Sequence, residues 1–166
     1  MIRLLPAGAL AALLAGAARI AAGVWPLESG TMLAEAVYGA IDFGFLFALA
    51  TLFLATYDRL GWRGWPSFLL ATLGAAILVG PNGTAGGVSG FVLGAGALLV
   101  GLSSLGILLL WRDRRFAVPG AAWVCALVLA LTGQPDIAGI VLAAGFVAAG
   151  VILLRREQAA GEAAIV

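Results

Sequence analysis

Long apolar stretches that follow one another along the chain constrain its fold more than any other feature of the sequence. A helix needs about 20 apolar residues to cross a hydrocarbon core of about 30 Å. Six stretches are apolar over a comparable length, although the third, fifth and sixth are short for a span. We expect them at about 4–25, 31–57, 66–80, 86–111, 117–133 and 137–154. The pattern predicts an all-α, polytopic membrane protein with six transmembrane helices.

The composition agrees with a membrane protein and excludes several classes of site. The chain is 63% hydrophobic and 10% charged, whereas soluble domains are about 45–50% apolar and 25% charged. It has no histidine and a single cysteine, Cys125, which lies in an apolar run and which we expect to be buried. We therefore predict no metal, no cofactor and no nucleic-acid partner. All nine basic residues are arginine, which suggests a GC-rich bacterial genome.

The distribution of arginine predicts the orientation in the membrane. Eight of the nine arginines precede the first span, follow the last, or lie in the connections after spans two and four. The other three connections contain no basic residue. The positive-inside rule therefore places both termini in the cytoplasm, in the cell (inner) membrane of a bacterium. Four tryptophans lie near expected span ends, as in an aromatic belt: Trp25, Trp62, Trp65 and Trp111.

The beginning of the chain has a second interpretation. A basic start followed by an apolar run and small residues is also the pattern of a secretory signal peptide. The sequence "MIRLLPAGALAALLAGAARIAAG" fits both patterns. We interpret it as the first span.

The prolines indicate an internal repeat. Pro26, Pro81 and Pro135 follow the odd-numbered spans at intervals of about 54 residues, a period typical of repeat architectures. We expect each to begin an outer turn that ends in glycine: "PLESG", "PNGTAG" and "PDIAG". The spans then form three tandem hairpins, at about 1–60, 61–115 and 116–156, in one domain (1–154) with a short cytoplasmic tail (155–166). The other prolines stand near the starts of spans one, three and five: Pro6, Pro66 and Pro119.

Glycine-rich hairpins with a short Pro/Gly outer turn and a basic inner loop resemble the HdeD-type family of bacterial acid-resistance membrane proteins. The segments that carry the resemblance are "FLLATLGAAILVGPNGTAGGVSGFVLGAGALLVG" (68–101) and "AWVCALVLALTGQPDIAGIVLAAGFVAAGVILL" (122–154), within residues 66–156. The resemblance implies a helical-hairpin fold, a cell-membrane location and a loose association with acid stress. It assigns no catalytic or binding residue.

Small residues at helical spacing predict packing faces, because helices in lipid associate through close contact. Gly86, Gly90 and Gly94 repeat every four residues, and span six has Gly145 and Ala149 at the same spacing. We expect intramolecular packing, with a homo-oligomer seam or a docking face for another subunit as the alternative. Ser103 is expected to bond either across helices or to its own helix.

Four residues of spans one and two form a charge cluster inside the expected membrane region. Arg19 and Glu35 are both expected roughly 8 Å below the outer surface, which favours an ion pair between neighbouring spans. Glu28, in the turn, is a competing partner of Arg19. Asp42 lies about 17 Å deep, on the same helix face as Glu35 and Tyr38, with no basic residue at its depth.

Asp42 has two interpretations. It is either a proton or cation site that Tyr38 and Arg19–Glu35 connect to the outer face, or a neutral acid that fixes helix register. The inner arginine cluster "WRDRR" fits topology and anionic headgroups.

The predicted function is that of a small structural, accessory-subunit or stress-response membrane protein. No nucleophile with a base, metal-ligand cluster or phosphate loop occurs in the sequence, so we predict no catalytic residue and no enzyme. Its expected partners are the lipid bilayer, other membrane subunits or further copies of itself. The alternative is a proton- or cation-coupled transporter, or a substrate-binding subunit like those of vitamin transporters, that uses Arg19, Glu35 and Asp42. Short outer loops leave little room for a vitamin pocket.

Overall fold

The computed structural model describes residues 4–28, 31–79, 84–85 and 88–163. Helices dominate this part of the chain, and their bounds are α1 Leu4–Val24, α2 Met32–Leu60, α3 Trp65–Val79, α4 Gly90–Arg112, α5 Ala117–Leu131 and α6 Pro135–Ala163. Two short 3-10 helices connect them, η1 (Gly61–Gly64) between α2 and α3 and η2 (Arg114–Phe116) between α4 and α5. Between α3 and α4, strands β1 (Thr84–Ala85) and β2 (Val88–Ser89) form a two-residue antiparallel ladder.

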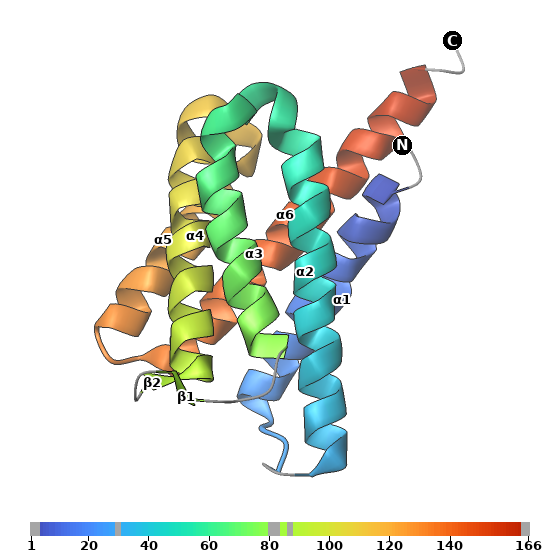
Figure 1. Cartoon of the computed structure of the whole chain (residues 1–166). Helices are drawn as coiled ribbons and strands as arrows, with labels where there is room; N and C mark the ends of the chain where they lie inside the picture. The colour runs from blue at the N-terminus through green and yellow to red at the C-terminus, as the bar shows by residue number, and fades with distance from the viewer. Residues whose placement is uncertain (1–3, 29–30, 80–83, 86–87, 164–166) are drawn as a thin grey trace.

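Five helical stretches of the described chain are long and apolar enough to cross a membrane. One of them, Met32–Val79, contains both α2 and α3. The chain reverses direction between these two helices (Figure 1), at Gly61, whose φ of +57° suits a residue without a Cβ. The other four stretches are Leu4–Val24, Gly90–Arg112, Arg114–Leu131 and Pro135–Arg156.

The helix starts follow ordinary capping chemistry, and one of them corrects a prediction from the sequence. Thr31 Oγ1 accepts a hydrogen bond from the Ala34 N–H, and Ser89 Oγ accepts one from Val92. Pro135 is the first residue of α6, where its missing N–H costs nothing, so "PDIAG" is helical and is not a turn. The actual turn is at 132–134, where Gly133 has a φ of +81°.

The end of α6 also differs from the expected tail. The helix continues from the bundle to Ala163, so the tail expected at 155–166 begins as helix. Figure 1 shows this C-terminal part of α6 extending beyond the neighbouring helices.

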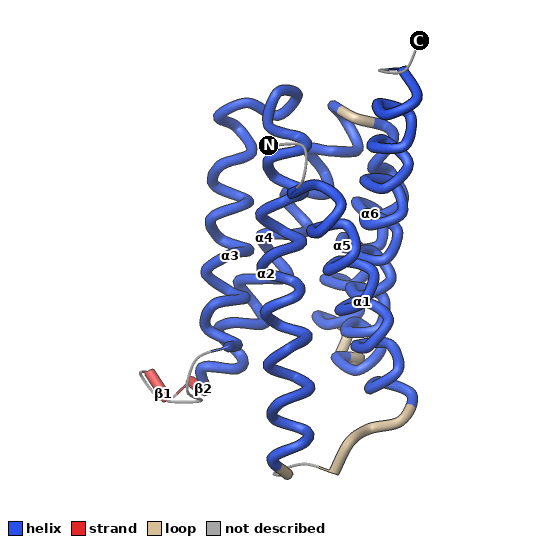
Figure 2. Tube along the Cα trace, turned by 90° about the vertical axis from the view of Figure 1, so that its right-hand side faces the viewer, coloured by secondary structure: helices blue, strands red, loops and turns tan. Residues whose placement is uncertain are grey.

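The helices form two layers. Figure 2 shows α2, α3 and α4 on one side and α1, α5 and α6 on the other. The consecutive pairs α1–α2, α3–α4 and α5–α6 each pack side by side, and α1 packs extensively against α6. The first and last helices therefore close the bundle. The contact between α2 and α3 is much sparser than the other contacts between consecutive helices.

Glycines permit the closest helix contacts. A Cβ at Gly101 of α4 would overlap the backbone of Ala71 in α3, and one at Gly106 would lie 2.7 Å from the Gly120 carbonyl oxygen of α5. A Cβ at Gly16 of α1 would lie 2.8 Å from the Ala143 carbonyl oxygen of α6. Helix backbones thus touch with no side chain between them.

The residues of the expected packing faces are placed as follows. Gly94 lies against Gly74 of α3, Gly145 lies against the indole of Trp123, and Ala149 is buried. Gly90 is the first residue of α4, and Gly86 lies outside the described residues.

Trp123 and its neighbours form the centre of the core. Trp123 is fully buried beside Phe146, whose ring stacks on Phe45 at 4.5 Å. Ser103 Oγ donates a 2.9 Å hydrogen bond to the Trp123 carbonyl, so this serine makes the cross-helix bond of the two alternatives. Cys125 was expected to be buried but is exposed, because it lies on the side of α5 that faces away from Trp123.

Two alanine substitutions on α4 test whether backbone contact holds the helices together. Gly101→Ala should lower the free energy of unfolding by about 1–3 kcal/mol, because the new methyl group overpacks the contact with Ala71. Gly96→Ala is the matched control, since nothing lies within 4 Å of its Cβ position, and should be neutral or stabilising by up to about 1 kcal/mol. Unfolding midpoints in one detergent measure both, and equal midpoints for the two variants would contradict the packing argument.

Candidate functional site

Most charged side chains of the described residues lie near the two ends of the bundle. At the end where α1 leads into α2 lie Arg19, Tyr38 and Asp42, here called the outer cluster. At the other end lie Arg59 of α2 and Asp113, which follows α4, here called the inner ion pair.

Arg19 is held between α2 and α6. Its guanidinium carbon lies 5.7 Å from the centre of the Tyr38 ring, within the range of a cation–π interaction. On its other side is Gly139 of α6, where a Cβ would lie 3.1 Å from Nη2 of Arg19. The absence of a side chain at Gly139 therefore leaves space for the guanidinium group.

The expected ion pair between Arg19 and Glu35 is not formed. Among the described residues, no carboxylate oxygen lies within 4.0 Å of an Arg19 nitrogen. Arg19 is five residues before the end of α1, about 7.5 Å along the axis, whereas Glu35 is only about 4.5 Å from the start of α2. Tyr38, at about 9 Å, matches the level of Arg19 better. Glu35 is exposed in the first turn of α2, where the helix dipole stabilises its charge.

Asp42 lies one turn beyond Tyr38 and is partly buried. Within the described part of the chain, its carboxylate takes part in no ion pair and in no hydrogen bond from Tyr38 or any other residue. Phe45, Leu49 and Leu52 follow along α2, and all three are buried. The charged part of α2 is thus succeeded directly by the apolar core.

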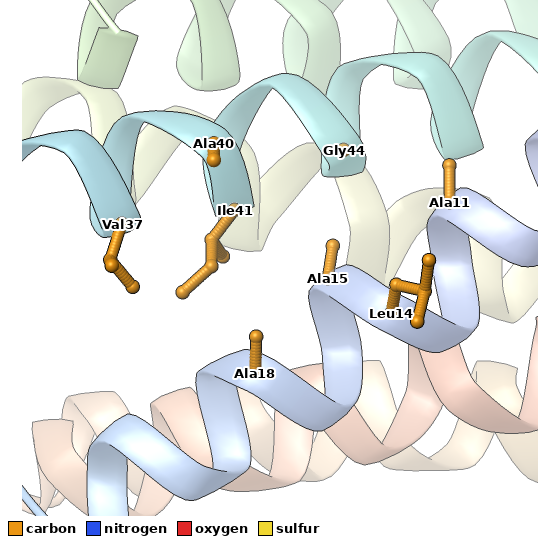
Figure 3. A pocket seen from close by; sticks show the side chains of 8 residues that line it. All are labelled: Ala11, Leu14, Ala15, Ala18, Val37, Ala40, Ile41 and Gly44. Atoms are coloured by element: carbon orange, nitrogen blue, oxygen red, sulfur yellow. The ribbon is translucent and has the colours of Figure 1, made fainter.

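An apolar groove of about 370 Å³ lies beside the outer cluster, between α1 and α2. Figure 3 shows its eight lining side chains, all from these two helices and all apolar. The helices meet where Gly44 faces Ala15, and they spread apart toward Ala18 and Val37. None of the outer-cluster residues lines this groove.

The inner ion pair connects the end of α2 to the loop between α4 and η2, which is far away in sequence. Arg59 Nε lies 3.2 Å from Asp113 Oδ2, and the two side chains are 46% and 2% exposed. Oδ2 of Asp113 accepts no hydrogen bond of suitable geometry. The nearby guanidinium group of Arg59 therefore compensates its negative charge by electrostatic attraction alone. The other oxygen, Oδ1, accepts a 3.3 Å hydrogen bond from the Arg115 N–H, and Asp113 thereby caps η2. Asp113 therefore shapes its own loop and fixes it to α2.

A second link joins α6 to α2 at the same end. Arg156 Nη1 donates a 3.1 Å hydrogen bond to the carbonyl oxygen of Ala55. Neither link was predicted from the sequence, because topology and anionic headgroups already account for arginines at these positions. The one available signal was Asp113, a single acid within "WRDRR" directly after an apolar span.

In the part of the chain that the structure describes, no three residues of the histidine, cysteine, aspartate or glutamate type gather as a metal site requires.

Comparison with known proteins gives no match: no family model, no curated protein and no solved structure corresponds to this chain. The resemblance to the HdeD-type family stays a prediction.

Two substitutions of Tyr38 test the contact with Arg19. Tyr38→Leu should lower the free energy of unfolding by about 0.5–2 kcal/mol, because it removes the ring face beneath the guanidinium group. Tyr38→Phe keeps the ring and should be nearly neutral, since no described residue bonds to the hydroxyl. A double-mutant cycle with Arg19→Gln isolates the pairwise energy. A zero coupling energy would show that Arg19 does not depend on the ring.

Arg59→Gln tests the inner ion pair. It should lower the free energy of unfolding by about 1–3 kcal/mol, because it leaves the buried Asp113 carboxylate without its cation. Arg63→Gln is the control: this exposed arginine belongs to the adjacent η1, has no ion pair in the described chain and should change stability by less than about 0.5 kcal/mol. Chemical unfolding in mixed micelles measures both. Equal losses would mean that only the net charge of this end matters.

Proposed function

We propose that this chain is a multi-pass membrane protein with a structural or accessory-subunit role and no catalytic activity. In this proposal α1 to α6 each cross the membrane, with α2 and α3 as separate passes and both termini in the cytoplasm. Long apolar helices and an exposed apolar surface support the location in a membrane. Four tryptophans near helix ends are exposed, as an aromatic belt requires, whereas Trp123 is buried.

The observation that best supports this role is the apolar packing in the middle of the bundle. Between the outer cluster and the inner ion pair, the core consists of packed apolar side chains such as Phe45, Leu102 and Trp123. The buried polar side chains of the described residues are few, namely Thr51, Thr56, Ser67, Ser103 and Asp113.

These buried polar groups do not form a path for an ion. The hydroxyls of Thr51 and Thr56 donate to carbonyls of their own helix, and that of Ser103 donates to α5. A transporter needs polar groups or broken helices near the membrane midplane. In the described core, the two threonines that lie between Asp42 and the inner end are bonded to their own helix, which favours a non-conducting role.

The proposed partners are lipids and other apolar helices. Many of the small residues that helices use for association are already occupied inside the bundle, at contacts such as Gly101–Ala71 and Gly106–Gly120. An association with acid stress, which the HdeD-type resemblance implies, belongs to the same proposal.

A second candidate function is supported by Asp42. This partly buried carboxylate has no ion pair or side-chain hydrogen bond among the described residues, as a proton or cation site requires. It would operate in a conformation that opens the apolar core below it.

Flux measurements on reconstituted vesicles separate the two functions. With an imposed proton or sodium gradient, the wild type should dissipate the gradient no faster than protein-free vesicles, and Asp42→Asn should behave identically. Leakage that depends on Asp42 would contradict the structural role and support the transporter.

Thiol labelling in cells tests the proposed topology. In a Cys125→Ser background, Thr132→Cys and Trp62→Cys place one exposed thiol at each end of the bundle. In intact cells, an impermeant maleimide should label only Thr132→Cys. Labelling of both positions, or of Trp62→Cys alone, would contradict the proposed topology.

A further inference from the structure

A second groove lies between α2 and α3, close to the end that carries the inner ion pair. Its volume is about 400 Å³, and its walls are Ala50, Phe53, Leu54 and Tyr57 of α2 with Trp65 and Phe68 of α3. The lining is almost entirely apolar, and four of its six side chains are aromatic. Leu54, Tyr57 and Trp65 are among the more exposed large side chains of the bundle.

The groove follows from the way the chain turns. The short η1 joins α2 to α3, and the two helices pack less extensively than any other consecutive pair. Near the turn, aromatic rings bridge the helices: Phe53 stacks on Phe68 at 4.2 Å and meets Trp65 edge-on at 5.1 Å. Beside these rings, the groove between α2 and α3 is open to the surroundings of the bundle.

The charge at the same end favours an anionic occupant. Seven arginines lie in the connections and helix ends here, against four acids, namely Asp58, Asp113, Glu157 and Glu162. Asp113 is already paired with Arg59. Arg63 is exposed within η1, two residues from Trp65 of the groove wall, and forms no ion pair with a described residue. A phosphate beside η1 would meet a net positive field and an available guanidinium fork.

We propose that this groove binds an anionic phospholipid, with an acyl chain against the aromatic wall and the headgroup phosphate at Arg63. The proposal rests on the membrane location proposed above. Lipid suits the shape of the site, because an acyl chain fits an elongated apolar groove between two helices that are already joined by a turn. The headgroup supplies the negative charge that the basic end lacks.

Tryptophan quenching by brominated lipid tests the site directly. The reporter variant is Trp25→Phe, Trp62→Phe and Trp111→Phe, which keeps Trp65 together with the fully buried Trp123 as a constant background. Vesicles contain fixed fractions of phosphatidylglycerol and phosphatidylcholine. The bromine is placed near the headgroup end of the acyl chain of one lipid or of the other, so the bulk composition never changes.

Trp65 should be quenched at least threefold more strongly per brominated molecule when the label is on phosphatidylglycerol. A second reporter, Trp25→Phe, Trp62→Phe and Trp65→Phe, keeps Trp111 at the same end of the bundle and should show no comparable preference. Equal quenching of Trp65 by both lipids would overturn the proposal. An equal preference at Trp65 and Trp111 would also overturn it, since this result means general attraction to the basic end.

Two variants with matched controls locate the lipid. Arg63→Gln should abolish the preference at Trp65, whereas Arg112→Gln, which removes an exposed arginine of the same end, should retain most of it. Ala50→Leu should reduce it by filling the groove, whereas Ala121→Leu, on the exposed surface of α5, should not. A preference that survives both Arg63→Gln and Ala50→Leu would overturn the proposal.

The experiment gives a different result if the chain does not lie in a membrane. Neither brominated lipid would then quench Trp65 or Trp111. Weak quenching of Trp65 by both lipids beside normal quenching of Trp111 would instead indicate that a polypeptide covers the groove, and this result would also overturn the lipid proposal.

Discussion

Direct contact between helix backbones is the constraint on which the rest of this structure depends. Lipid is as apolar as the side chains that face it, so helices in a membrane gain little from apolar burial and associate through close packing. Gly16, Gly101 and Gly106 each bring a neighbouring backbone to a distance that a Cβ would prevent. The extensive α1–α6 contact then closes the bundle around Trp123 and Phe146. Leucine and phenylalanine fill the remaining space.

Such close packing restricts where charge can lie. A charged group in the apolar middle would be expensive, and most described charges lie near the ends, where those that are buried or partly buried have a local compensation. Arg19 has the Tyr38 ring and the space at Gly139, and Asp113 has Arg59 and a backbone N–H. Asp42 is the exception, because it lies deepest and has no such partner among the described residues. In the second candidate function, transport would begin at Asp42.

The sequence predicted the positions of the helices well, because apolar length alone marks them, and Pro66 and Pro119 do stand in first turns. It predicted the partner of Arg19 wrongly. Which residues meet across two helices depends on where each helix ends. An error of two or three residues in a predicted helix end shifts the expected contact by about one helical turn. Pro135 shows the same limit, since a proline suits both a turn and a first helical position. The pairing of Arg59 with Asp113 joins a helix end to a distant loop, and no local sequence pattern indicates such a contact.

The helix α2 contributes to both grooves described above. Apolar grooves flank it on both sides, toward α1 at its outer half and toward α3 at its inner half. Large apolar side chains such as Met32, Phe43 and Leu54 remain exposed along it, and Asp42 and Tyr38 belong to it as well. Polar interactions join α2 to other parts of the bundle near its inner end, namely the Arg59–Asp113 ion pair and the hydrogen bond from Arg156 to the Ala55 carbonyl oxygen.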